Sequence, residues 1–482
     1  MQRSWPKYEP RGLAKSPQLI ERQIDLSLSH CQPLPTQDLA RALLNRIWKS
    51  LGLLAIAALV TWMLYPTGRR PELTIATVNN ADMILMQQLS SDFEKQNGVK
   101  LNWVVLGENV LRQRLTIDIS TGSNTFDVIT IGSYEAPLWG ERGWLVPLDD
   151  LGADYGYEDI FDVVRQGLSY KGRLYAAPFY AESSFTYYRK DLFQKAGFEM
   201  PVQPSYEQIR QFAKRLHDPE HGTYGICLRG EPGWGENVAY ISTLVHTFGG
   251  RWTDLDWKPE ITSPAWTEAV SFYVDLLGKY GPPGATTDGY NENRALFANG
   301  NCAMWIDATS AAGYILDPTQ SRVATTTGFA KAPIAKVPNG AAWIWSWGLA
   351  VPTSSKRTDL AKQFIKWATS RQYINTVGQR FGWLQIPPGS RKSTYEIPAY
   401  MQATPFAPLV RDAILSVDYT KPSVLPVPYV GIQYVGIAEF QAIGTEVGQE
   451  INAALAGRAT VQQALKLSQA EAERSLEGRS HK

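Results

Sequence analysis

The stretch "YAAPFYAESSFTYYRKDLFQKAGFEMP", residues 175–201, is dense in Tyr and Phe and carries Glu182 and Ser183 within a strand-like pattern. Alternation along a strand directs Phe185 and Tyr187 toward the same face, where we expect them to pack. The stretch is therefore either an aromatic core strand or a surface that holds a ligand. The rest of the chain decides between these two interpretations.

The composition indicates a large protein with a neutral partner. The 482 residues exceed the span of roughly 250–300 residues that one hydrophobic core serves, so two lobes or domains are expected. Lys and Arg number 47 against 46 Asp and Glu, which leaves no basic surface for nucleic acid. The 16 Trp and 23 Tyr supply rings for a neutral, partly apolar ligand, although most such rings are core in any protein.

The N-terminal region has an organisation of its own. Residues 1–50 form a polar extension with an excess of basic residues, and "LGLLAIAALVTWMLY", residues 51–65, is uncharged and apolar. The positive-inside rule leaves the extension in the cytoplasm and exports the rest of the chain. No A-x-A cleavage site or lipidation cysteine follows, so we expect a retained membrane helix rather than a cleaved signal. A misassigned start codon would also account for the leader.

The cysteines and histidines give no sign of a metal site. The five histidines are scattered, and no Cys/His cluster has the spacing of a zinc site. We expect no metal and no cofactor. Cys227 and Cys302 fall on the exported side, where they either pair or stay as buried free thiols, because the sequence gives no distance between them.

From residue 72 onward, β-branched runs alternate with longer amphipathic stretches. Such alternation predicts a parallel sheet with helices on both faces. Ligands of such sheets bind beyond the carboxyl ends of the strands, so the loops 79–82 and 133–145 are the ones to watch. The predicted elements are strands 72–78, 99–107 and 126–132 and helices 83–98 and 109–122.

Three further segments carry a family resemblance. They are "KGRLYAAPFYAESSFTYYRKDLFQKAGFEMPVQPSYEQIRQFAKRL" (171–216), "ALFANGNCAMWIDA" (295–308) and "WGLAVPTSSKRTDLAKQFIKWATS" (347–370). Together with the first strands they resemble the extracellular solute-binding proteins of ABC importers, in the sugar- and polyol-binding branch. The resemblance covers roughly residues 72–470.

The resemblance implies an α/β fold with two lobes, the periplasmic-binding-protein fold, in which the chain crosses between lobes several times. A ligand is held in the cleft between the lobes. The first stretch quoted above then falls at the first crossing. The implied division is an N-terminal lobe of 72–180 with 340–386 and a C-terminal lobe of 186–330 with 390–470.

Glu182 matches a position where the family often carries an acidic ligand-binding residue, and a solvated hinge carboxylate is the alternative. The segment "GEPGWG" (230–235) lacks the Lys and the glycine spacing of a phosphate-binding loop. Period-two alternation places Trp343, Trp345 and Trp347 on one face, for sheet packing or ligand contact. The predicted ligand-binding residues are Asn79, Asn80, Tyr134, Glu135, Trp139, Tyr180, Glu182, Ser183, Arg229, Glu231, Trp234, Asn237, Trp305, Asp307, Trp345, Trp347, Tyr429 and Tyr434.

The resemblance implies a binding protein rather than an enzyme. Its ligand would be a small neutral polyhydroxy compound, a sugar or sugar alcohol, and its partners the permease subunits of an ABC importer in the cell membrane. A ligand-sensing module for a membrane receptor is one alternative. A membrane-anchored glycoside hydrolase is another, with Glu135 and Glu182 as its two carboxyls. The sequence leaves the particular sugar or polyol open.

The N-terminal segment gives a first prediction. If residues 51–65 remain in the membrane, the mature protein fractionates with the inner membrane and begins before residue 50. Cell fractionation followed by N-terminal sequencing checks this. A soluble mature form that begins after Tyr65 would contradict it.

Overall fold

A computed structural model of the protein describes residues 44, 46–52, 54, 56 and 70–479. The chain divides into two compact units, residues 1–69 and 70–482. In the first unit, the described residues are helical and exposed. Most of the predicted membrane segment 51–65 lies outside the described residues. Within the described ranges, no helix is both long enough and apolar enough to cross a membrane.

A mixed sheet organises the second unit, with the strand order β2-β1-β3-β9-β6-β7 and with β8 also paired to β6. Strands β1, β2 and β3 are parallel, as the sequence predicts. Strand β9 is antiparallel to both β3 and β6, and β7 and β8 are antiparallel to β6, so the prediction of a parallel sheet is wrong for β7, β8 and β9. The strands are β1 Glu72–Val78, β2 Lys100–Leu106, β3 Val128–Gly132, β4 Ser169–Tyr170, β5 Arg173–Leu174, β6 Ala177–Arg189, β7 Met304–Ala308, β8 Thr327–Lys331 and β9 Ile344–Ala350.

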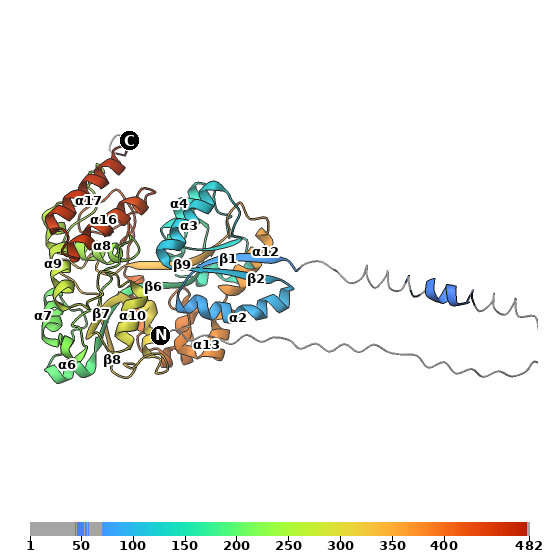
Figure 1. Ribbon diagram of the computed structural model, residues 1–482, viewed down its shortest axis with the longest axis horizontal. Helices are drawn as coiled ribbons and strands as arrows, with labels where there is room; N and C mark the ends of the chain where they lie inside the picture. Colours follow the sequence, from blue (N-terminus) through green and yellow to red (C-terminus); the bar gives the residue numbers. More distant parts are fainter. Residues whose placement is uncertain (1–43, 45, 53, 55, 57–69, 480–482) are drawn as a thin grey trace, which may run out of the picture. The chain divides into compact units, whose positions relative to one another are not determined.

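Strand β6 belongs to two groups of strands. Its residues from Ala177 to Ser183 pair with β9, and those from Ser184 to Arg189 pair with β7 and β8. It therefore carries the chain from one lobe into the other, and β6 and β9 lie between two groups of helices (Figure 1). Residues 332–343 bring the chain back into β9, which explains why β9 runs opposite to β6. The Ala181 N–H also donates to the Pro388 carbonyl at 2.9 Å.

The helices of the first lobe follow from local signals in the sequence. Asn80 caps α2, because its side chain accepts from the Met83 N–H at 2.9 Å. Gly98 ends α2 and Gly122 ends α3, each with a φ of 63° that suits glycine. The helices of this lobe are α2 Ala81–Asn97, α3 Glu108–Thr121, α4 Glu135–Glu141, α5 Asp162–Gly167, α12 Thr358–Ala368 and α13 Arg371–Phe381.

The second lobe has a strongly aromatic core. Tyr187 of β6 stacks on Trp305 of β7, with ring centroids 4.6 Å apart, and both side chains are fully buried. Its helices are α6 Lys190–Ala196, α7 Tyr206–Leu216, α8 Asn237–Thr247, α9 Pro264–Tyr280, α10 Tyr290–Ala298, α11 Ala312–Leu316, α16 Phe440–Leu455 and α17 Val461–Leu476. Two further helices, α14 Pro398–Ala403 and α15 Ala407–Leu415, lie between α13 and α16 in the chain. The described residues of the unit also form six 3-10 helices: η1 Ala153–Tyr155, η2 Tyr157–Asp159, η3 Pro219–His221, η4 Thr309–Ala311, η5 Trp383–Gln385 and η6 Lys392–Glu396.

Cys227 and Cys302 form a disulfide, which decides between the two possibilities that the sequence leaves open. Their Cα atoms are 5.9 Å apart, and the bond closes a loop with a sequence separation of 75 residues. The Cys227 N–H donates to the Met304 carbonyl at 2.9 Å, so the bond joins the segment that leads to Arg229 to the start of β7. This disulfide stabilises the second lobe where it approaches the first.

Removal of the disulfide should lower the stability of the second lobe. For a loop of this length we expect the Cys227→Ala/Cys302→Ala variant to lose about 2–4 kcal/mol of unfolding free energy, because its unfolded chain is less constrained. Urea denaturation of parent and variant measures the difference. Reductant serves as the control, since it should destabilise the parent and leave the variant unchanged. Equal midpoints would contradict the prediction.

Candidate functional site

Two adjoining cavities, which we call the inner and outer chambers, lie between the lobes. Their volumes are about 40 and 50 Å³, and they share Glu108, Glu182, Arg229 and Trp347. The inner chamber is also lined by Arg112, Trp234, Gly235, Ala239, Trp343, Trp345 and Gln433. The outer chamber is also lined by Val78, Asn79, Asn80, Tyr180, Glu236, Tyr290, Asn291, Ala308 and Ser310.

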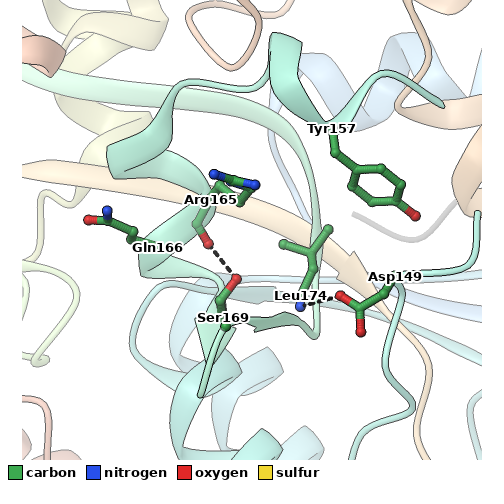
Figure 2. Close-up of a pocket in the computed structure, with 7 residues that line it drawn as sticks. Asp149, Tyr157, Arg165, Gln166, Ser169 and Leu174 are labelled. Atoms are coloured by element: carbon green, nitrogen blue, oxygen red, sulfur yellow. Dashed lines mark hydrogen bonds between the residues drawn. The ribbon is translucent and has the colours of Figure 1, made fainter. Parts of the chain in front are cut away.

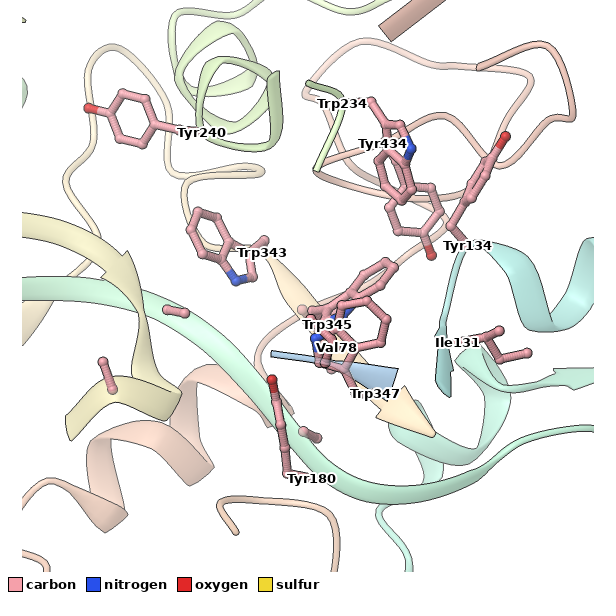
Figure 3. Close-up of a cluster of buried hydrophobic side chains, with 14 of the residues drawn as sticks. Val78, Ile131, Tyr134, Tyr180, Trp234, Tyr240, Trp343, Trp345, Trp347 and Tyr434 are labelled. Atoms are coloured by element: carbon pink, nitrogen blue, oxygen red, sulfur yellow. The ribbon is translucent and has the colours of Figure 1, made fainter. Parts of the chain in front are cut away.

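Several strand ends converge on the chambers. Asn79 and Asn80 follow the carboxyl end of β1, and Glu108 opens α3 directly after β2. Glu182 comes from the crossing strand β6. Figure 3 shows Trp343, Trp345 and Trp347 near Trp234, which comes from the facing lobe. Elements that are far apart in the sequence therefore meet at the edge of the sheet where ligands of α/β proteins bind.

Arg229 is held by acceptors of its own lobe. Its Nη2 lies 2.6 Å from Asp307 Oδ1, and its Nε lies 3.0 Å from Asp307 Oδ2. Its Nη1 donates to the Gly235 carbonyl at 2.8 Å and lies 3.4 Å from Glu236 Oε2. Burial alone would lower the pKa of Arg229, but the charges of Asp307 and Glu236 outweigh it and raise the pKa well above the ordinary value. This guanidinium stays charged, and each of its three nitrogens donates within its own lobe.

Arg112 forms a similar cluster on the first lobe. It pairs with Glu135 and lies 2.7 Å from Glu108 Oε1. Glu135 in turn accepts from the Gly132 N–H at 2.9 Å. The Arg112 guanidinium also stands 4.0 Å from the centroid of the Trp234 ring, which belongs to the second lobe. Such a cation–π contact contributes about 0.5–2 kcal/mol when it is shielded from water, so it favours contact between the lobes.

Glu182 differs from the other acidic residues of the site because half of its carboxyl is unsatisfied. The side chain is buried, and its Oε2 has no hydrogen-bond partner among the residues that the structure describes. Burial raises the pKa of Glu182 to about 8, against the opposing effects of a Ser310 hydrogen bond and the Arg229 charge. A buried acceptor without a partner costs free energy, and a hydroxyl group in the cavity would satisfy it.

The glycines of "GEPGWG" allow the lobes to approach each other closely. A Cβ on Gly235 would lie 2.1 Å from Glu108 Oε1, and one on Gly233 would lie 2.7 Å from Asn109 Oδ1. The first lobe also reaches the second through Tyr134, whose hydroxyl donates to the Ile437 carbonyl at 2.9 Å. The structure therefore has its lobes in contact around the chambers.

The structure brings eight of the predicted ligand-binding residues to the chambers: Asn79, Asn80, Tyr180, Glu182, Arg229, Trp234, Trp345 and Trp347. The other ten do not line them: Tyr134, Glu135, Trp139, Ser183, Glu231, Asn237, Trp305, Asp307, Tyr429 and Tyr434.

Most of those ten residues have structural partners. Glu135 and Asp307 hold the two arginines, and Trp305 donates to Asp307 Oδ2 at 3.1 Å. Ser183 donates to the Trp343 carbonyl at 2.7 Å, and Asn237 donates to the Gly448 carbonyl at 2.9 Å.

The tyrosines and two further side chains of this group also have places outside the chambers. Tyr434 donates to the Ser133 carbonyl at 3.2 Å, and Tyr429 accepts from the Trp252 N–H at 3.0 Å. Trp139 is buried in the core. Glu231 accepts from Asn109 Nδ2 at 3.4 Å, across the two lobes.

Sequence reasoning missed several lining residues, above all Glu108, Arg112, Glu236, Tyr290 and Gln433. Glu108 and Arg112 had a usable signal. They lie in the first turns of the helix that follows the second strand. Ligands of such sheets bind beyond the carboxyl ends of the strands, so this position was also a candidate. Gln433 had none, because it lies in a segment without regular secondary structure, far from the sheet in sequence.

Two larger hollows lie outside the chambers. One of about 390 Å³ is on the first lobe, beside Asp149, Tyr157 and Arg165 (Figure 2). Another, of about 450 Å³, lies beside the crossing segments and includes Phe185 and Lys331. No residue that lines either hollow has a buried side-chain polar atom without a partner, among the residues that the structure describes. The chambers are therefore the better candidate site.

Two α/β lobes with a buried, polar, tryptophan-lined cavity between them define a two-lobe ligand-binding protein. The sequence profile of the bacterial extracellular solute-binding proteins matches residues 79–374. The chain belongs to this family, as the sequence resemblance indicates.

Individual relatives agree with this assignment. The chain is 54% identical over 405 residues to a mannitol-binding protein of Pseudomonas aeruginosa, an alignment that covers 84% of this chain and 93% of the relative. A solute-binding protein of Agrobacterium vitis S4, solved with D-mannitol, has a TM-score of 0.84 and 52% identity, covering 85% and 99% of the two chains. One of Agrobacterium radiobacter K84, solved with ribitol, has a TM-score of 0.75 and 28% identity, covering 84% and 98%. The predicted two-lobe α/β fold is confirmed.

The buried carboxyl of Glu182 predicts a pH-dependent stability. Its pKa is raised from about 4.5 to about 8 in the folded protein, so its contribution to stability is complete below pH 4.5 and is lost as the pH rises toward 8. The side chain of the Glu182→Gln variant does not titrate, so the variant does not lose this stability as the pH rises. We expect the melting temperature of the parent, without ligand, to fall relative to that of the variant between pH 5 and pH 8.

Differential scanning fluorimetry across this pH range measures the difference. Glu220→Gln is the matched control. Glu220 is exposed, so the melting temperature of this variant should follow that of the parent at every pH. A difference between parent and Glu182→Gln that stays constant with pH would show that the carboxyl is ionised at all of these values.

Proposed function

We propose that this protein is the substrate-binding component of an ABC importer, and that it captures an open-chain sugar alcohol between its lobes and delivers it to the permease. The observation that carries the proposal is the unpartnered carboxyl oxygen of Glu182 in a small cavity walled by tryptophans. The ligand is neutral, since each arginine of the site is already paired with carboxylates of the protein.

The chemistry of the chambers suits a polyol. Apolar C–H groups of such a ligand pack on indole rings, and its hydroxyls need matched acceptors and donors. Acceptors are available at Glu182 and at the Asn79 amide, and donors at Tyr180 and Tyr290. The small volumes of the chambers do not suit a long oligosaccharide.

The relatives support the same class of ligand. The relative from Pseudomonas aeruginosa is a mannitol-binding protein, and the two solved relatives contain D-mannitol and ribitol. Both compounds are open-chain alditols. We propose D-mannitol as the first ligand to be tried, with ribitol as the shorter alternative.

We further propose that capture involves no chemical reaction. A hydrolase that used Glu135 and Glu182 would need both carboxyls at the ligand. Glu135 instead accepts from Arg112 and from the Gly132 N–H, and it does not line either chamber. Ligand binding acts by favouring the form in which the lobes are in contact, because that form makes the additional contacts.

The lobe division and the location are part of the proposal. We assign residues 72–180 and 340–386 to the N-terminal lobe, and residues 186–330 and 390–470 to the C-terminal lobe. The partner switch along β6 at Ser183 and Ser184 supports this division. The binding unit acts outside the cytoplasm, and residues 51–65 anchor it to the inner membrane, which the fractionation experiment above tests.

Binding assays test the proposed function. A thermal-shift screen of alditols and cyclic sugars should show its largest stabilisation with D-mannitol, because a ligand raises stability by RT ln(1 + [L]/Kd). Isothermal titration calorimetry of Glu182→Ala should then give an affinity roughly ten- to a hundredfold weaker than that of the parent, as expected for the loss of two hydrogen bonds to the ligand. Glu220→Ala is the exposed control. If Glu182→Ala binds as tightly as the parent, Glu182 does not contact the ligand.

A further inference from the structure

Gln433 presents a second unpartnered acceptor to the inner chamber. It lies in the irregular segment between α15 and α16, and 3% of its surface is exposed. Its Nε2 donates to the Ile344 carbonyl at 2.7 Å. This bond fixes the orientation of the amide, because a carbonyl oxygen facing Ile344 would have no hydrogen to donate. The other atom, Oε1, has no hydrogen-bond partner among the described residues.

Two buried oxygen atoms without a hydrogen-bond partner therefore line one small cavity. Oε1 of Gln433 and Oε2 of Glu182 are both unsatisfied, and both residues line the inner chamber. Each such atom left without a partner is costly. Acceptors are satisfied by hydrogens, so the group that enters the chamber must be a donor such as a hydroxyl. An ether oxygen or a carbonyl would leave Gln433 Oε1 unpaired.

The cations beside the chamber do not offer an anion a place. Arg112 gives its nitrogens to Glu108 and Glu135. Arg229 gives its nitrogens to Asp307, Glu236 and the Gly235 carbonyl. A carboxylate at the end of a ligand would thus face the Gln433 acceptor and two guanidinium charges that the protein's own carboxylates already balance, which disfavours sugar acids at this position.

The dimensions of the inner chamber limit it to the end of a chain. Its volume is about 40 Å³, and every lining residue except Glu108 is buried. Trp234, Trp343 and Trp345 line it but do not line the outer chamber. The outer chamber continues from it through the residues that both share. A linear ligand can place one terminal carbon in the inner chamber and the rest of its chain in the outer one.

We propose that the inner chamber is a binding site for the terminal hydroxymethyl group of an open-chain alditol and that Gln433 is its specificity-determining residue. The inference rests on the proposed function and adds the part of the ligand that is recognised. The terminal hydroxyl donates to Gln433 or Glu182, and its carbon packs on the tryptophans. A hexopyranose also carries a hydroxymethyl group, but a ring rather than a linear chain follows it, so it fits the two small chambers less well.

Ligand analogues combined with a Gln433 variant test the inference. D-mannitol has twofold symmetry, so both ends must be altered, and 1,6-dideoxy-D-mannitol replaces both terminal hydroxyls by hydrogen. We expect the parent to prefer D-mannitol by about a hundredfold in calorimetry, roughly tenfold for each lost hydroxyl contact. In Gln433→Met this preference should shrink about tenfold. D-mannarate, with a carboxylate at each end, should not bind the parent.

The matched control is Gln469→Met. Gln469 also donates its Nε2 to a backbone carbonyl, that of Pro259 at 2.9 Å, but it lies on α17 away from the chambers. A purely structural role of Gln433 would weaken both ligands equally and leave the preference unchanged, which would overturn the inference. Tight binding of D-mannarate would overturn it as well. If the parent binds neither D-mannitol nor ribitol, the proposed function itself fails.

Discussion

The site depends on strand β6, which is shared between two lobes. The strand pairs with β9 up to Ser183 and with β7 and β8 from Ser184, so its backbone hydrogen bonds belong to both lobes. Glu182 stands next to this switch and is therefore held at the point where the lobes meet. A carboxyl group at this position is buried when the lobes are in contact, and burial makes its unpartnered oxygen a strong site for a ligand hydroxyl.

The two buried arginines organise the rest of the cavity. Each is paired with carboxylates of its own lobe, Arg112 with Glu108 and Glu135, and Arg229 with Asp307 and Glu236. Such pairing satisfies charges that would otherwise be costly to bury, and it leaves the cavity without a free ionic partner for a ligand. What remains exposed to the cavity are unpartnered oxygen atoms and the tryptophan walls, which suit the proposed neutral polyol. The Arg112 contact with Trp234 also joins the two lobes, so the same residue serves closure and selectivity.

Much of the fold could be predicted because the signals are local. Strand β1 occupies residues 72–78 as predicted, and helices α2 and α3 end at Asn97 and Thr121, next to the predicted ends at 98 and 122. The direction of β9 could not be predicted from its own residues. Its orientation is set by a return from the second lobe, which depends on residues far away in the chain.

The sequence by itself predicted an α/β protein of two lobes, and it pointed to Glu182, Arg229 and the alternating tryptophans near 345, which line the chambers. Alternation, charge balance and residue type carry this information along the chain. Only the tertiary structure decided which polar groups are already satisfied. Asp307 and Asn237 are already hydrogen-bonded to other parts of the protein. Gln433, which no local sequence pattern marks, keeps an acceptor without a partner in the cavity. Whether a buried polar atom has a partner depends on contacts between distant segments, and those contacts exist only once the lobes have come together.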